Sequence, residues 1–231
     1  MIAADAPLDI TATALVQTGD VAGLQALLAE HPDLATERFG DENMSRTLLH
    51  AATDWPGNYP NGPAMVAALV AAGADVNARF SGPHTETPLH WAASSDDVVM
   101  IDALLDAGAD IEADGAVLTG GSPLADAVVF GQWQAAQRLV ERGAVLTLWQ
   151  AAALGPPDLV RRIVAAESPS GDALTNALWH AARSGSRPIA EFLVSVGADP
   201  RWVGYDDLTP AAVAAREGHT ALAAWLRATP S

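Results

Sequence analysis

The sequence predicts an all-α repeat fold, a solenoid of stacked helix pairs, on three observations. Half of the 231 residues are hydrophobic, and Ala and Leu are far more common than β-branched and aromatic residues, which favours helices over strands. A segment like Thr-Pro-Leu-His-Trp-Ala-Ala, at 87–93, recurs along the chain. A second landmark, an apolar stretch ending in Gly-Ala, places glycines at 73, 108 and 143, with 35 residues in each step. Such a period is typical of a repeat protein.

Seven copies of this unit are expected, and together they are predicted to form one domain over residues 1–231. The copies start near positions 10, 47, 87, 122, 146, 176 and 209. The first copy is degenerate and ends in Ala-Glu-His-Pro-Asp-Leu-Ala, while the last ends with the chain. Both are expected to act as caps, since terminal repeats need a polar outer face. The stack is therefore expected to be complete.

The third copy explains why each copy should form two helices. Thr87 can cap a helix that Pro88 begins, because Thr accepts hydrogen bonds from free N–H groups and Pro suits the first helical turn. Apolar residues then recur at helical spacing over 98–105. Gly108 is expected to end this second helix in a left-handed conformation. A single pair cannot bury both of its faces, but stacked copies can.

These segments resemble the ankyrin repeat, whose pattern runs Thr-Pro-Leu-His, Ala-Ala, Gly, an apolar helix and Gly-Ala-Asp. The resemblance covers almost the whole chain, in about seven copies. It implies an ankyrin-type α-solenoid, in which the first helices line a concave groove and short β-hairpin loops, the fingers, project beside it. It also implies a non-enzymatic, protein-binding scaffold that uses the groove and the fingers.

The repeat spacing departs from this pattern in three places. Residues 55–63, Trp-Pro-Gly-Asn-Tyr-Pro-Asn-Gly-Pro, form a turn-rich insertion within the second copy, either a tolerated surface loop or a contact. The linkers 143–147 and 166–175 are too short for a full finger. Intact fingers are expected at 78–86, 112–121 and 201–208. The two missing fingers either reflect decayed copies or open the groove to a ligand.

The histidines of the repeat are predicted to be structural. The position of His50 and His90 is taken, in the other copies, by Ala125, Trp149, Trp179 and Ala212. A metal ligand or general base is not exchangeable with Trp and Ala. No cysteine, phosphate-binding loop or nucleophile motif is present in the sequence. No catalytic residue, metal or cofactor is therefore expected, although enzymatic activity stays open.

The resemblance implies that binding residues lie where the copies differ, at positions facing the groove and on the fingers and loops. The candidate binding residues are Asp54, Trp55, Tyr59, Phe80, Glu86, Phe130, Leu154, Arg183, Trp202, Tyr205 and Asp206. Their mixture of acids and aromatics suits a protein partner with a basic or amphipathic segment. The alternative is a small-molecule or catalytic pocket, lined by aromatic side chains where the two fingers are missing.

The net charge of −16 limits the classes of partner. Such a surface repels nucleic-acid phosphates and acidic lipids, so neither nucleic acid nor a membrane is expected as a partner. The N-terminal residues lack the basic and apolar regions of a secretion signal, and no apolar stretch is long enough to span a bilayer. The expected compartment is the cytoplasm.

Overall fold

The structure is a computed structural model, and it describes residues 1–230. The chain divides into two compact units, Met1–Val145 and Leu146–Ser231, which are described in turn. The single domain expected over 1–231 stays a prediction.

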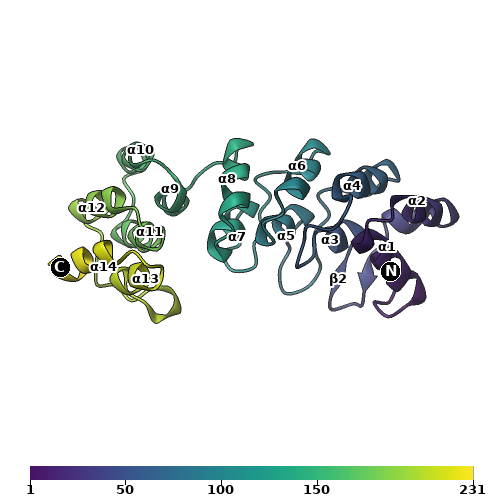
Figure 1. Ribbon diagram of the computed structural model, residues 1–231, viewed down its shortest axis with the longest axis horizontal. Coiled ribbons are helices and arrows are strands. Elements are labelled where there is room, and N and C mark those ends of the chain that lie inside the picture. Colours follow the sequence, from purple (N-terminus) through teal and green to yellow (C-terminus); the bar gives the residue numbers. More distant parts are fainter. Residues whose placement is uncertain (231) are drawn as a thin grey trace. The chain divides into compact units, whose positions relative to one another are not determined.

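The unit Met1–Val145 is a row of helix pairs. The pairs are α1 (Pro7–Thr18) with α2 (Val21–Glu30), α3 (Leu48–Thr53) with α4 (Gly62–Ala71), α5 (Pro88–Ser94) with α6 (Val98–Asp106), and α7 (Pro123–Phe130) with α8 (Trp133–Glu141). Each inner helix, the first of its pair, packs on the next inner helix, and each second helix packs on the next second helix, so the pairs form two layers (Figure 1). A 3-10 turn, η1 (Pro32–Ala35), follows α2.

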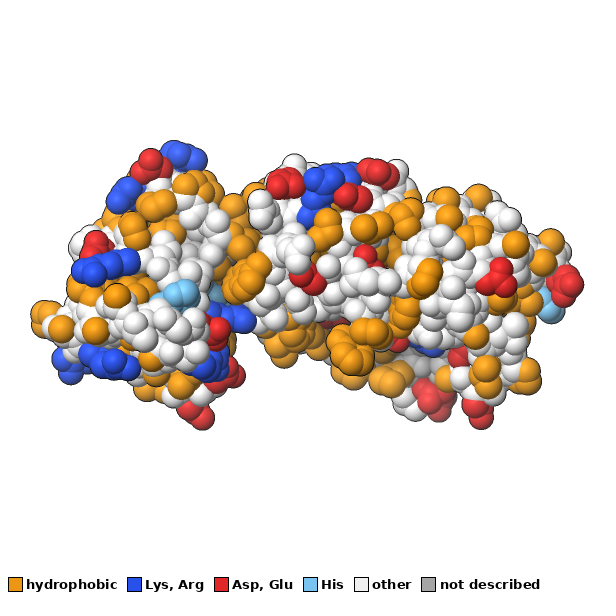
Figure 2. All heavy atoms as spheres, viewed as in Figure 1, with side chains coloured by type: hydrophobic (Ala, Val, Ile, Leu, Met, Phe, Trp, Pro, Cys, Tyr) orange, Lys and Arg blue, Asp and Glu red, His pale blue; other side chains and the backbone are white. Residues whose placement is uncertain are grey.

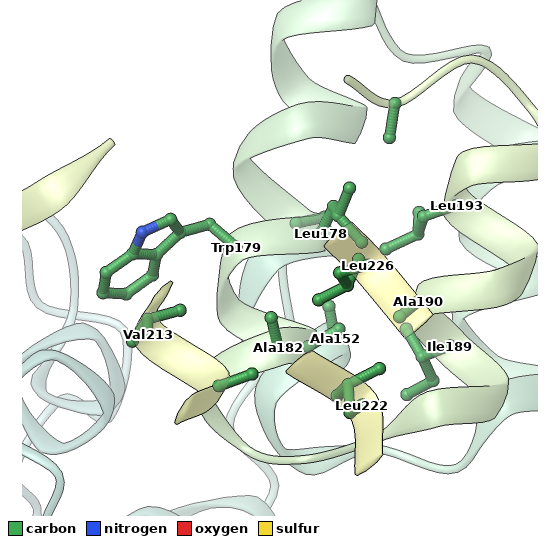
Figure 3. Packing of buried hydrophobic residues seen from close by; sticks show 14 of the residues in the cluster. Ala152, Leu178, Trp179, Ala182, Ile189, Ala190, Leu193, Val213, Leu222 and Leu226 are labelled. Atoms are coloured by element: carbon green, nitrogen blue, oxygen red, sulfur yellow. The ribbon is translucent and has the colours of Figure 1, made fainter. Parts of the chain in front are cut away.

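The unit Leu146–Ser231 repeats the arrangement with three pairs. They are α9 (Leu148–Leu154) with α10 (Pro157–Glu167), α11 (Gly171–Arg183) with α12 (Arg187–Ser195), and α13 (Pro210–Arg216) with α14 (Thr220–Ala228). A 3-10 turn, η2 (Tyr205–Asp207), precedes α13. The core is built mainly from Ala, Leu and Val, and it includes the ring of Trp179 beside Val213 (Figure 3). Small residues on facing helices allow the helices to pack closely.

The helices begin and end as the repeat pattern predicts. Thr87 is the N-cap of α5, and Asp97 caps α6 by accepting a hydrogen bond from the backbone N–H of Met100 at 3.0 Å. Asp96 accepts one from Ala135 at 2.7 Å, at the start of α8. Gly108 has a φ of +96°, which is costly for any residue with a Cβ. The adjacent aspartates are therefore explained as helix caps.

Only the first finger forms paired strands among the described residues. Strand β1 (Phe39–Gly40) pairs antiparallel with β2 (Ser45–Arg46), and Ser45 also bridges to Ser81 in the next finger. This first finger was not among those predicted from the sequence. The fingers at 78–86 and 112–121 are turns, each closed by backbone hydrogen bonds.

The two short linkers lack fingers, as predicted, and the second one has become helix. The chain passes from Gly143 to α9 in a few residues. After α10, helix α11 already begins at Gly171, and Ser170 caps it by accepting from the N–H of Ala173 at 3.2 Å. The helix therefore starts before the copy start predicted near 176, and the linker forms an additional turn.

The histidines hold neighbouring copies together, as predicted. In His90, Nδ1 accepts from the backbone N–H of Thr87 at 3.1 Å, so Nε2 carries the proton and donates to the carbonyl oxygen of Gly121 at 3.1 Å. His50 makes the same pair of bonds, to Thr47 and to the carbonyl oxygen of Glu86. Both accepting residues directly precede the N-cap of the next inner helix.

The other copies make this connection differently. Trp179 donates its indole N–H to the carbonyl oxygen of Leu208 at 2.9 Å, and Leu208 directly precedes the N-cap Thr209. The assignment of Trp149 to the same position was wrong by one residue. Gln150 lies three residues after the N-cap Thr147 and completes its capping box, as His90 does for Thr87.

Candidate functional site

An open hollow of about 190 Å³ lies between the inner helices and the fingers of the unit Met1–Val145. We call it the acidic hollow; its lining residues come from three consecutive copies. They are Asp54, Trp55, His84, Glu86, Trp91, Ser94, Ser95, Val117 and Phe130. The hollow brings together four of the residues predicted from the sequence to bind a partner, namely Asp54, Trp55, Glu86 and Phe130.

Two aromatic side chains of the acidic hollow are unusually exposed. Trp55 is 80% exposed and Phe130 is 45% exposed. The indole of Trp91 is half-buried and packs edge-on against His50, with 5.0 Å between ring centroids. Figure 2 shows hydrophobic side chains gathered over the loops below α3, α5 and α7. Grouped exposed apolar surface of this kind is typical of interaction sites.

Glu86 and Asp54 supply the carboxylates of the hollow. The carboxylate of Glu86 is buried, and Oε1 accepts from the backbone N–H of Val117 at 2.9 Å. The other oxygen, Oε2, lies 3.1 Å from Nδ1 of His84. Asp54, at the end of α3, accepts from the N–H of Trp55 at 2.9 Å, and its second oxygen is 3.4 Å from Arg46.

A second buried carboxyl group, that of Asp126 on α7, interacts with Glu86. Asp126 is fully buried, and among the described residues no N–H or O–H donor reaches either oxygen. Burial and the adjacent negative charge of Glu86 raise the pKa of Asp126 to about 9. At neutral pH Asp126 is therefore protonated and can donate its proton to Glu86. This pair was missed by the sequence reasoning; its one signal was an Asp inside the apolar stretch Pro-Leu-Ala-Asp-Ala-Val-Val-Phe.

Two other predicted residues of this unit lie beside the acidic hollow. Phe80 is 8% exposed and stacks on His84 with 4.4 Å between ring centroids, so it supports the wall of the hollow from inside. Tyr59 lines a separate hollow of about 150 Å³, together with Asp97 and Met100, and donates to the carbonyl oxygen of Trp55 at 3.3 Å. The insertion thus holds the backbone of Trp55 in place.

The predicted residues of the unit Leu146–Ser231 lie around a packed aromatic cluster. Trp179 is 3% exposed, and its ring meets Tyr205 edge-on at 5.1 Å. Trp202 meets Tyr205 in the same way at 6.0 Å. His180 lies 4.6 Å from Trp149, and burial lowers the pKa of His180 to about 3. Trp179 is packed among these rings, whereas Tyr205 at the edge of the cluster is 51% exposed.

The remaining predicted residues of this unit make local contacts. Asp206 pairs with Arg216 at 2.7 Å, and the hydroxyl of Tyr205 donates to Asn176 at 3.1 Å. Arg183 is half-buried, and burial lowers its pKa. Leu154 is half-buried at the end of α9.

Over residues 1–230, no group of three or more His, Asp or Glu side chains is arranged to hold a metal ion. Within the same range, no helix has the length and hydropathy needed to cross a membrane.

Comparison with known proteins agrees with the fold. Residues 61–147 match the family described as ankyrin repeats, in three copies. Among solved structures, the ankyrin repeat domain of human ASB11 matches with a TM-score of 0.58 and 22% sequence identity, covering 98% of this chain and 100% of that domain. No curated protein sequence matches the chain. Residues 61–147 thus carry ankyrin repeats and the chain has the ankyrin repeat fold; ankyrin repeats are generally scaffolds for protein interactions.

Proposed function

We propose that this chain is a non-enzymatic, protein-binding scaffold of the cytoplasm that holds a partner in its groove and against its fingers. The observation that carries the proposal is the acidic hollow, in which Trp55 and Phe130 are exposed beside two carboxylates. Exposed aromatic side chains at the centre of a contact region supply most of the binding energy in typical interfaces. The partner is expected to present a basic or amphipathic segment.

The test is a paired affinity capture with the native chain and the Trp55→Ala/Phe130→Ala variant as baits. The variant removes two exposed rings, so the fold is expected to survive, which circular dichroism checks. The proposal predicts a protein that the native chain retains and the variant loses. Identical sets of retained proteins, or none specific to the native chain, would refute it.

One observation favours a second candidate function, the binding of a small molecule with or without chemistry. Asp126 is a buried acid with a raised pKa next to a hollow, a combination often found at ligand sites. Native mass spectrometry of the chain after incubation with a cell extract tests this candidate. A retained compound that is lost in Asp126→Asn would support it, and an unchanged mass would exclude it.

A further inference from the structure

We infer that the acidic hollow binds an arginine side chain of the partner, stacked on Trp55 and paired with the carboxylates of Glu86 and Asp54. This inference rests on the proposed function and specifies the chemistry that the partner must present. It rests on three observations: the exposed rings, the excess of carboxyl groups, and the buried carboxyl of Asp126 beside Glu86.

The exposed rings suit a flat cation. A guanidinium group is planar and weakly hydrated, and it stacks on aromatic faces, Trp best of all. Trp55 offers the ring of the hollow that is most open, at 80% exposed, and its backbone is fixed by the hydrogen bond from Tyr59. An aliphatic partner side chain could cover the rings, but it would bring no positive charge to the carboxylates of the hollow.

The carboxyl groups around the hollow outnumber its cations. Asp54 and Glu86 line the hollow, whereas Asp126, beside Glu86, is protonated and adds no charge. Arg46 lies 3.4 Å from Asp54 and 3.4 Å from the hydroxyl of Thr13. His84 is charged only when protonated. The whole chain carries 28 acidic residues against 12 Lys and Arg. An acidic segment would therefore be repelled, and a basic segment attracted.

The buried carboxyl of Asp126 forms an acidic pair with Glu86, which lines the hollow. Buried carboxyl oxygens nearly always accept hydrogen bonds, yet neither oxygen of Asp126 meets a donor among residues 1–230. Its neighbour is Glu86, an acceptor that lines the hollow. Arginine presents five N–H donors in a fork that pairs with carboxylates in bidentate geometry, so one guanidinium can pair with Glu86 while Asp126 keeps its proton.

The test uses three fluorescein-labelled peptides that differ at one residue type: glycine-spaced arginine, the same peptide with lysine, and the same peptide with neutral citrulline. Fluorescence anisotropy at low salt measures their affinity for the full chain. The arginine peptide is expected to bind at least about tenfold more tightly than the citrulline peptide, which has the same shape without the charge. Lysine is expected to lie between them, since it forms no bidentate pair.

Two variants assign the binding to the hollow. Trp55→Ala alters an exposed side chain, and Glu86→Gln is nearly isosteric. Each substitution is expected to lower the affinity for the arginine peptide about fivefold or more. Glu167→Gln, which removes the same charge at an exposed residue of α10, is the matched control and should change affinity less than twofold. Thermal unfolding confirms that each variant is folded.

Three results would overturn the inference: equal binding of the arginine and citrulline peptides, no effect of Trp55→Ala, or an equal loss in Glu167→Gln. The last result would mean that the net charge alone attracts the peptide. If the arginine peptide does not bind more tightly than the citrulline peptide, while partner capture still depends on Trp55 and Phe130, the inference is wrong and the scaffold proposal stands. If partner capture is independent of both rings, the scaffold proposal falls.

Discussion

Trp55 and Trp179, one from each unit of the chain, have opposite surroundings. In the unit Met1–Val145, Trp55 is 80% exposed and lies at an open hollow with carboxylates. In the unit Leu146–Ser231, Trp179 is 3% exposed and donates its indole N–H to Leu208 within a packed cluster. The seven Trp residues of the chain are therefore no general sign of a ligand site.

The same comparison shows how one connection between copies can be built from different residues. His90 and Trp179 each donate one ring N–H to the carbonyl oxygen before the next N-cap. Only this donor is needed for the connection, so an imidazole and an indole can replace each other. The imidazole of His90 titrates and the indole of Trp179 does not. The contribution of the histidine connection to stability should therefore depend on pH, while that of the tryptophan connection should not.

The largest expected effect is on stability, from Trp179→Ala. The substitution removes a buried ring and leaves the carbonyl oxygen of Leu208 without its donor, so the free energy of unfolding should fall by about 3–5 kcal/mol. Urea denaturation followed by circular dichroism measures it. A loss below about 1 kcal/mol would show that Trp179 is not part of the core.

Acid is the next probe, because burial lowers the pKa of His50 to about 3, of His90 to about 4 and of His180 to about 3. A histidine with a lowered folded-state pKa contributes stability that is present above its unfolded-state pKa, about 6.5. This stability is lost as the pH falls toward 4, by up to about 1.4 kcal/mol per pH unit for each group.

The measurement is urea unfolding between pH 7 and pH 4, with His90→Gln as the comparison. Gln is already a capping-box partner in this chain, at Gln150, so the variant is expected to fold. Its stability should fall less steeply with acid than that of the native chain. Parallel curves would show that His90 does not titrate on unfolding.

Asp126→Asn is expected to have a smaller effect on the pH dependence of stability, with a sign opposite to that of the histidines. The folded-state pKa of Asp126, about 9, lies above the unfolded value of about 3.9, so the native chain loses stability as the pH rises between these values. The amide does not titrate. Between pH 5 and pH 8 the free energy of unfolding of the variant should therefore rise relative to that of the native chain, by about 1–3 kcal/mol. A difference that is independent of pH would mean that Asp126 is ionised in the folded state.

The smallest effect on stability is expected for Trp55→Ala, which should change the free energy of unfolding by less than about 0.5 kcal/mol because the ring is exposed. The same urea experiment, run beside Trp179→Ala, gives the contrast between the two units. If both substitutions destabilise the chain equally, the distinction between an exposed and a packed Trp is wrong.

The sequence was sufficient for the helix pairs, their caps and the structural histidines, because these features depend on local patterns that repeat. It was insufficient where the pattern is ambiguous: three consecutive alanines, Ala151 to Ala153, allowed the copy to be aligned one residue out, so Trp149 was assigned in place of Gln150. The start of α11 was missed because no Gly-Ala-Asp landmark precedes it.

The candidate site could be predicted only in part. Asp54, Trp55, Glu86 and Phe130 were found because they vary at positions that face the groove. The contact between Glu86 and Asp126 joins residues from different copies, and a residue in an apolar helix gives no sign of which neighbour it meets across the stack. Phe80 was predicted as a contact residue, but it is buried under His84, because exposure depends on how the finger folds back.

The central claim is that a partner binds at the acidic hollow, and hydrogen exchange of the chain with and without its captured partner tests it most directly. The loops 55–60, 81–86 and 114–120 should exchange more slowly in the complex, while the aromatic cluster of the unit Leu146–Ser231 should exchange at an unchanged rate. Protection confined to residues 146–230, with the three loops unaffected, would contradict the claim.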